Sequence, residues 1–287
     1  MPDREPIALT IVTGFLGAGK TTLLNWLLKD PALTDTAVIV NEFGEIAIDH
    51  FLVETAGDGG IELGGGCLCC TVRGELADTL MALAERPQRP RRVVLETTGL
   101  ADPAPVLQAL AAHPVLSARY RPEVVIAVVD AVNSAPTLDA HEEARRQTAL
   151  ADRIVITKAE LAADAPEALR ARLATLNSEA AIVDSRDATA LTATNLLRPG
   201  FAGGSRTPQT PPFSEAHHHH HHGHHASHFN SVCLVHEGPL PLMAVENFLD
   251  LVTTQQGDRI LRIKGLMETD DDPGRRVLIQ GAQRLLH

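Results

Sequence analysis

The sequence is poor in aromatic residues, in positive charge and in long apolar runs. Among its 287 residues are one Trp, one Tyr and seven Phe, so aliphatic side chains must fill any core. No run of about 18 apolar residues occurs, which argues against a membrane-spanning helix. The polar residues 1–6 lack the apolar segment of a signal peptide. The net charge of -11 argues against broad nucleic-acid binding. Together these features predict a cytoplasmic protein with neither membrane nor nucleic-acid partners.

Cysteine is scarce and clustered. Cys67, Cys69 and Cys70 stand within four positions, a pattern unlike a disulfide framework and more typical of a metal site or a redox pair. Soft thiolates favour Zn²⁺, with Cu(I) as an alternative. The motif cannot close a tetrahedral site alone, so a further ligand must come from elsewhere. Inert buried thiols and a redox pair stay as alternatives, and Cys233 is predicted to be a core residue.

A complete phosphate-binding motif, G-x-x-x-x-G-K-[ST], follows the first apolar run and leads into a helical pattern. Its glycines let backbone N–H groups point at phosphate oxygens, and the helix N-terminus adds further donors. Lys20 would reach the β- and γ-phosphates, and the Thr21 hydroxyl would bind Mg²⁺. The predicted nucleotide-binding residues of this loop are Gly14, Gly17, Ala18, Gly19, Lys20, Thr21 and Thr22.

Apolar strands alternate with helical patterns over residues 6–197. Strands are predicted at 7–13, 36–40, 92–95, 124–129, 153–156 and 181–183, and helices at 22–28, 74–84, 103–112, 138–149 and 166–176. This alternation predicts the α/β class, with a doubly wound, mostly parallel sheet of the P-loop NTPase type in a domain spanning 1–197.

The pattern stops at residues 198–228, which are rich in Pro, Gly and His and are predicted to be a linker. Its histidines could gather Zn²⁺, Ni²⁺ or Co²⁺ weakly, or simply be solvated. Residues 229–287 are predicted to form a small α+β domain with strands at 231–236, 259–264 and 276–280 and a helix at 241–255.

Two further segments fit a nucleotide site. Glu96 ends a buried strand, where a carboxylate can hold Mg²⁺, and Gly99 would let the loop approach the γ-phosphate. In the segment 157–160, Glu160 could accept hydrogen bonds from guanine N1 and N2 while the Lys158 stem packs on the base. A solvated Lys–Glu pair is the alternative there.

The combination of motifs resembles the CobW-type metallochaperone GTPases, relatives of the HypB and UreG nickel-insertion GTPases. The segments that carry the resemblance are 14–22, 41–45, 65–70, 96–103, 261–266 and 280–284. The resemblance implies GTP hydrolysis coupled to delivery of zinc, or of cobalt in some members, to a client protein. The chain departs from the family at Glu160, where Asp is usual, and at His287, where the family normally continues. It is expected to be either a shortened member or a truncated chain, with a second domain that is incomplete or relies on a partner to cover a sheet edge.

These observations predict a GTPase with Lys20, Thr21, Glu96 and Gly99 as its catalytic residues and GTP, Mg²⁺ and Zn²⁺ as its ligands, with Co²⁺ or Ni²⁺ as alternatives to zinc. Glu42 is a candidate for contact with Mg²⁺, zinc or water, as are Glu45 and Asp49. GTP would order this segment and the cysteine loop, and hydrolysis would release the metal. Three alternatives stay open: a metal-sequestration protein, a P-loop kinase and a redox switch. The oligomeric state is open as well.

Overall fold

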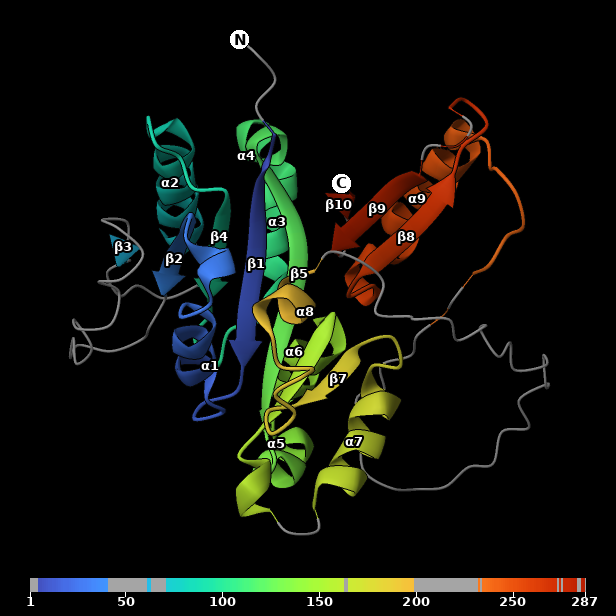
Figure 1. Ribbon diagram of the computed structural model, residues 1–287. Helices are drawn as coiled ribbons and strands as arrows, with labels where there is room; N and C mark the ends of the chain where they lie inside the picture. The colour runs from blue at the N-terminus through green and yellow to red at the C-terminus, as the bar shows by residue number, and fades with distance from the viewer. Residues whose placement is uncertain are drawn as a thin grey trace, which may run out of the picture.

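A computed structural model describes residues 5–40, 61–62, 71–162, 165–198, 232, 234–272, 274, 276–282 and 285–286. Only the backbone is described at 61–62, 71–75, 165–166, 258, 278, 280, 282 and 285–286. These residues form a seven-stranded sheet in the order β3-β2-β4-β1-β5-β6-β7 and a three-stranded sheet in the order β10-β9-β8 (Figure 1). In this part of the chain, no helix combines the length and the apolarity that crossing a membrane requires.

The large sheet consists of β1 (Ile7–Gly14), β2 (Thr36–Val40), β3 (Ile61–Glu62), β4 (Arg92–Glu96), β5 (Tyr120–Asp130), β6 (Arg153–Thr157) and β7 (Ala181–Asp184). Every strand pair in it is parallel. Its helices are α1 (Lys20–Leu27), α2 (Thr71–Glu85), α3 (Ala104–Ala112), α4 (Pro114–Arg119), α5 (Ser134–Ala140), α6 (Glu142–Leu150), α7 (Ala165–Leu176) and α8 (Ala193–Leu197).

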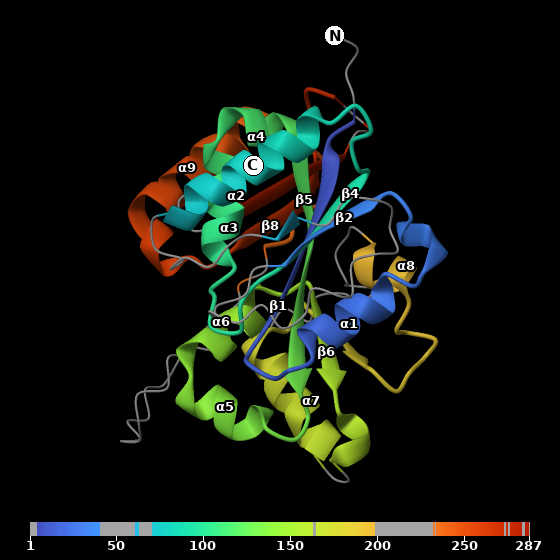
Figure 2. The ribbon, with the colours of Figure 1, turned by 90° about the vertical axis from the view of Figure 1, so that its left-hand side faces the viewer.

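Helices cover both faces of this sheet. Ile7, Leu9 and Ile11 of β1 join the cluster built with α2, α3 and α4, whereas Val12 joins the cluster built with α1 and α8. Figure 2 shows α1 and α8 on one side of the strands and α2, α3 and α4 on the other. All eight residues of β1 are buried, as a strand covered on both faces requires. The predicted doubly wound, parallel α/β sheet is confirmed.

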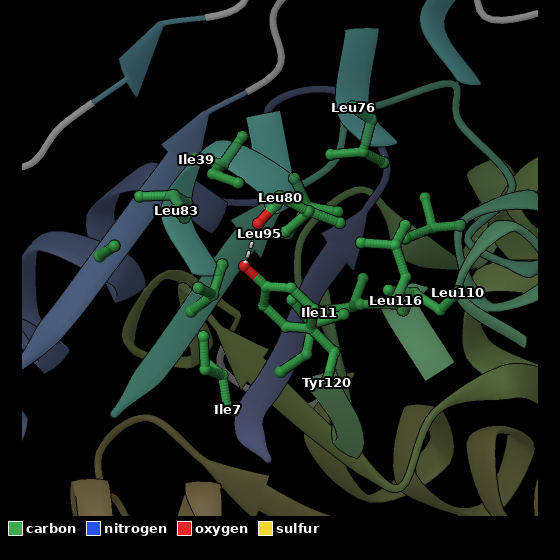
Figure 3. Close-up of a cluster of buried hydrophobic side chains, with 14 of the residues drawn as sticks. Ile7, Ile11, Ile39, Leu76, Leu80, Leu83, Leu95, Leu110, Leu116 and Tyr120 are labelled. Carbon is green, nitrogen blue, oxygen red and sulfur yellow. Dashed lines mark hydrogen bonds between the residues drawn. The ribbon is translucent and has the colours of Figure 1, made fainter. Parts of the chain in front are cut away.

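Tyr120, the one tyrosine of the chain, is enclosed in the first of these clusters (Figure 3). Its hydroxyl donates a 2.6 Å hydrogen bond to the Leu80 carbonyl oxygen, which ties the start of β5 to α2. Burial raises the pKa of the phenol, since the charged form would lose its hydration.

Two helices replace the single one predicted over 138–149. The chain turns at His141, whose backbone is extended between α5 and α6. Arg145 donates to the carbonyl oxygens of Leu138 and Asp139 at the end of α5, so a side chain satisfies the groups that a continuous helix would have bonded. The ring of His141 packs 4.5 Å from that of Phe15, between centroids.

The C-terminal sheet is antiparallel, with β8 (Ile263–Glu268) between α9 (Leu242–Gln256) and β9 (Arg276–Ala282) in sequence, followed by β10 (Leu285–Leu286). The predicted small α+β unit is confirmed. The strand predicted at 231–236 is wrong for residues 232 and 234–236, which have no partner strand among the described residues. The strand predicted at 259–264 starts only at Ile263, because a 3-10 turn, η3 (Gly257–Arg259), extends the end of α9.

Buried Asp152 joins the two sheets. Its carboxylate accepts hydrogen bonds from Lys264 Nζ at 2.7 Å, Arg262 Nη2 at 2.9 Å and the Val125 backbone N–H at 2.8 Å. Burial raises the pKa of this carboxyl, but the two cations and the hydrogen bonds outweigh that effect and hold the pKa below its usual value. Arg262 also donates to the Leu150 carbonyl oxygen at the end of α6, so the C-terminal sheet is anchored on α6 and β6.

Asp152→Asn should lower the free energy of unfolding by about 3 kcal/mol, because it removes the buried carboxylate charge that binds two partly buried cations, Arg262 and Lys264. The ionised carboxylate stabilises the fold above its ordinary pKa, and this stabilisation is lost as the pH falls through the lowered native pKa. Urea denaturation between about pH 7 and pH 3 should therefore show a weaker acid dependence for the variant. Asp139→Asn, which breaks an exposed pair with Arg172, is the control and should cost at most about 1 kcal/mol. Equal losses from the two variants would contradict this account.

Candidate functional site

The glycine-rich loop joins β1 to α1 at the carboxyl edge of the large sheet. Gly14, Gly17 and Gly19 adopt positive φ angles of 145°, 71° and 95°, which side chains disfavour. Lys20 is the first residue of α1, and its Nζ lies 3.3 Å from the Phe15 carbonyl oxygen. The N-terminus of α1, where the first N–H groups have no partner within the helix, thus adjoins the loop, which is an arrangement suited to an anion.

Glu96, at the end of β4, contacts Thr21 in the first turn of α1. Glu96 ends β4, pairs in register with Val12 of β1, and is 2% exposed. The Thr21 hydroxyl donates to Glu96 Oε1 at 2.8 Å. A hydroxyl and a carboxylate oxygen side by side are the donor set that Mg²⁺ takes in proteins, so these residues fit the ion.

Gly99 packs directly against the glycine-rich loop. A Cβ at this position would lie 2.7 Å from the Leu16 backbone N and 2.6 Å from Leu16 Cδ2. Any side chain would therefore push the two loops apart. The hydroxyl of Thr97, the first residue after β4, donates to Thr13 Oγ1 at 2.9 Å, so the loop after β4 is bonded to β1 as well.

Thr157 and Lys158 hold the glycine-rich loop from the other side. The Thr157 hydroxyl donates to the Ala18 carbonyl oxygen at 2.6 Å, and Lys158 Nζ donates to that of Gly17 at 2.8 Å. Lys158 has a left-handed backbone with φ of 55°, and its Nζ also lies 2.7 Å from Asp130 Oδ2. The ammonium group of Lys158 is thus hydrogen-bonded to the loop and ion-paired with Asp130.

Asp130 is a site residue that the sequence reasoning missed. Burial raises the pKa of its carboxyl, but hydrogen bonds from Lys158, Asn133 and the Val132 backbone N–H outweigh this and lower the pKa. Asp130 therefore stays ionised and fixes the Lys158 ammonium group. The available signal was its place at the end of a buried strand, the same position that identified Glu96.

The structure does not bring every predicted residue to this loop. Glu160 lies in the turn η2 (Ala159–Leu161) and is exposed. The described contacts place its charge near Arg186, whose pKa is raised by its hydrogen bond to Asp184 and, more weakly, by Glu160. Among the described residues, Glu160 forms no hydrogen bond or ion pair with the glycine-rich loop.

The predicted metal ligands Glu42, Cys67, Cys69 and Cys70 lie outside the described residues. Their flanks are described. Val40, the last residue of β2, pairs in register with Glu96, so the chain leaves the sheet beside that carboxylate. The helix α2 begins at Thr71, immediately after the cysteine motif. Within the described residues, His, Cys, Asp and Glu side chains do not gather in threes around any point that could hold a metal.

A parallel sheet in this strand order, a glycine-rich loop after β1 and an acidic residue at the end of the adjacent strand define a P-loop NTPase fold. The family model for the CobW/HypB/UreG nucleotide-binding domain matches residues 8–184, and that for the cobalamin synthesis protein CobW C-terminal domain matches residues 229–287. The chain belongs to the CobW/HypB/UreG family.

Similar proteins agree with this assignment. The zinc chaperone YjiA of Escherichia coli is 35% identical over 289 aligned residues, which cover 98% of this chain and 87% of that protein. The crystal structure of Zn(II)-bound YjiA GTPase from E. coli superposes with a TM-score of 0.62 at 30% identity, covering 99% and 88% of the two chains. The zinc-regulated GTPase metalloprotein activator 1 of Schizosaccharomyces pombe is 30% identical over 189 residues, 63% of this chain and 46% of that protein.

Gly14→Ala should destabilise the protein by about 3 kcal/mol, for two reasons. The new methyl group would overlap the Val128 carbonyl oxygen of β5, and the positive φ at position 14 would strain the alanine backbone. Gly17→Ala is a matched control in the same loop. It also has a positive φ, but no atom outside its own chain neighbours lies within 4 Å of the added Cβ. It should cost only about 1 kcal/mol of strain. Thermal or urea unfolding of both variants measures the difference, and equal costs would show that contact with β5 does not constrain the loop.

Proposed function

We propose that this chain is a GTP-hydrolysing zinc metallochaperone, which binds GTP at the loop 14–22 and couples hydrolysis to transfer of zinc to a client metalloprotein. The observation that carries the proposal is the 2.8 Å hydrogen bond between Thr21 of that loop and buried Glu96. This contact brings the loop that would bind the phosphates and the carboxylate that would hold Mg²⁺ to the same edge of the sheet. The names of the family relatives, zinc chaperone and zinc-regulated GTPase metalloprotein activator, agree with both halves of the proposal.

The phosphates of GTP would lie along the backbone of the glycine-rich loop and the N-terminus of α1. The residues in this role are Gly14, Gly17, Ala18, Gly19, Lys20, Thr21 and Thr22. Lys20 would turn from the Phe15 carbonyl oxygen toward the β- and γ-phosphates. Because α1 begins at Lys20, the positive end of its helix dipole adds to the positive potential at the same point.

Thr21 and Glu96 would hold Mg²⁺, which supplies positive charge against the phosphate oxygens when it is bound. The protein prepares these two ligands by pairing β1 with β4. Gly99 brings its backbone to the same place, because its missing side chain lets the loop after β4 touch Leu16. A backbone N–H delivered there can stabilise charge on the γ-phosphate.

Lys158 and Glu160 are proposed to recognise the guanine base. Lys158 is already fixed by Gly17 and Asp130, so its aliphatic stem is held beside the loop where a base can pack. Glu160 would accept hydrogen bonds from the N1 and N2 groups of guanine, which adenine cannot supply together. Its exposed position leaves the carboxylate accessible to a base.

Zinc is proposed to bind as cargo at Cys67, Cys69 and Cys70, with Glu42 as a further ligand of zinc or Mg²⁺. The flanks of this segment support a link to the nucleotide, because Val40 pairs beside Glu96. A change of state at the γ-phosphate would then be passed to the zinc ligands through the chain that continues from Val40. Cobalt or nickel are alternatives to zinc. The client, the cytoplasmic location and the division into 1–197, 198–228 and 229–287 stay predictions.

The purified chain should hydrolyse GTP slowly and in preference to ATP, as a phosphate-release assay with each nucleotide would measure. Lys20→Ala should lower kcat/KM for GTP about 100-fold or more, because one fixed positive charge at the transferring phosphate is lost. Lys29→Ala, at an exposed position beyond the end of α1, is the control and should leave hydrolysis unchanged. Equal rates with both nucleotides, or hydrolysis unaffected by Lys20→Ala, would contradict the proposal.

Replacing Cys67, Cys69 and Cys70 together by Ser should abolish tight zinc binding while GTP binding persists, since serine hydroxyls are poor ligands of zinc. Cys233→Ser is the matched control and should leave zinc affinity unchanged. Zinc competition against a chromophoric chelator measures the first effect, and nucleotide titration measures the second. Unchanged zinc affinity in the triple variant would place the zinc site elsewhere.

A further inference from the structure

The helix α6 contacts the loop that follows β4. Gln147 of α6 is 1% exposed, and its Nε2 donates to the carbonyl oxygens of Gly99 at 3.1 Å and Ala101 at 2.9 Å. One buried amide therefore holds two backbone groups of this loop. Among the described residues, no other side chain donates a hydrogen bond to either of these two carbonyl oxygens.

The neighbouring residue of α6 strengthens the same contact. Arg146 Nη1 lies 3.1 Å from Asp102 Oδ2, and Asp102 Oδ1 accepts a hydrogen bond from the Ala104 backbone N–H at the start of α3. Gln147 thus holds the middle of the loop while Arg146 holds its end. The loop 97–102 is fixed between α6 on one side and the glycine-rich loop, at Leu16, on the other.

The chemistry of the contact requires a hydrogen-bond donor at position 147. Both partners are carbonyl oxygens, so only a donor satisfies them. The Gln147 Oε1 atom has no hydrogen-bond partner among the described residues, which shows that the side chain is committed to the loop through its donors alone. A glutamate of the same shape would instead oppose two carbonyl oxygens with a carboxylate.

We propose that Gln147 is a positioning residue for GTP hydrolysis: it fixes the peptide after Gly99 so that the loop keeps its approach to the glycine-rich loop. This inference rests on the proposed function, because the loop that Gln147 of α6 holds is the one proposed to approach the γ-phosphate. In this role Gln147 acts through the loop 97–102 and not by contact with the nucleotide. Its loss should therefore affect kcat more than the affinity for GTP, since geometry at the γ-phosphate changes while the loop 14–22 stays intact.

The test compares Gln147→Met and Gln147→Glu with Asn177→Leu in the full chain. Asn177 is also a buried amide whose Nδ2 donates to backbone carbonyl oxygens, those of Thr148 and Ala151, at the other end of α6. Replacing Asn177 should lower the free energy of unfolding about as much as replacing Gln147 does, but Asn177 does not contact the loop 97–102. Where Gln147→Met does not fold, the shorter Gln147→Asn, which cannot span both carbonyl oxygens, provides the same readouts.

Single-turnover hydrolysis should fall about tenfold or more in both Gln147 variants, with GTP affinity nearly unchanged and Glu at least as damaging as Met. The Asn177 variant should keep its rate. Backbone amide hydrogen exchange over residues 97–104 should quicken in the Gln147 variants only. An unchanged rate or unchanged exchange in these variants, or an equal loss in Asn177→Leu, would overturn the inference. A wild-type chain without GTPase activity would overturn the proposed function instead, and the exchange pattern would still decide whether Gln147 fixes the loop.

Discussion

The parallel pairing of β1 with β4 is the constraint on which the site depends. It aligns Val12 with Glu96, so that one strand ends in the glycine-rich loop while the next presents a carboxylate beside it. The hydrogen bond from Thr21 to Glu96 and the contact of Gly99 with Leu16 both follow from this alignment. The buried apolar faces of β1, covered by α2, α3 and α4 on one side and by α1 and α8 on the other, keep the two strands in register. The core thereby fixes the geometry at the sheet edge.

The supports of the site come from distant parts of the chain. Lys158 and Asp130 secure the glycine-rich loop from β6 and β5, and Gln147 secures the loop after β4 from α6. The far end of α6 carries the Leu150 carbonyl oxygen, which Arg262 of the C-terminal unit binds next to Asp152. One helix thus contacts both the loop 97–102 and the C-terminal sheet. This continuity places the C-terminal unit one helix away from the candidate nucleotide site.

Sequence reasoning predicted the features that depend on local spacing. The glycine-rich loop, the strand ending at Glu96 and the alternation of strands and helices all lie in short windows, and the fold confirms the class they predict. It missed Asp130 and Gln147, because their partners Lys158 and Gly99 are 28 and 48 residues away in the chain. The break at His141 and the late start of β8 likewise depend on Arg145 and on the turn after α9, which no periodicity reports. Predictions for the cysteine motif fall on residues that the structure does not describe.

We propose that nucleotide state controls zinc binding at the cysteine motif, and zinc titration is the decisive experiment. The affinity for zinc would be measured on the nucleotide-free protein, on its GDP complex and on its complex with a non-hydrolysable GTP analogue. The account predicts that the GTP-analogue and GDP complexes differ by about fivefold or more, and that zinc shifts the affinity for the analogue by the same factor, since coupling is reciprocal. Equal zinc affinities in all three states would contradict the account.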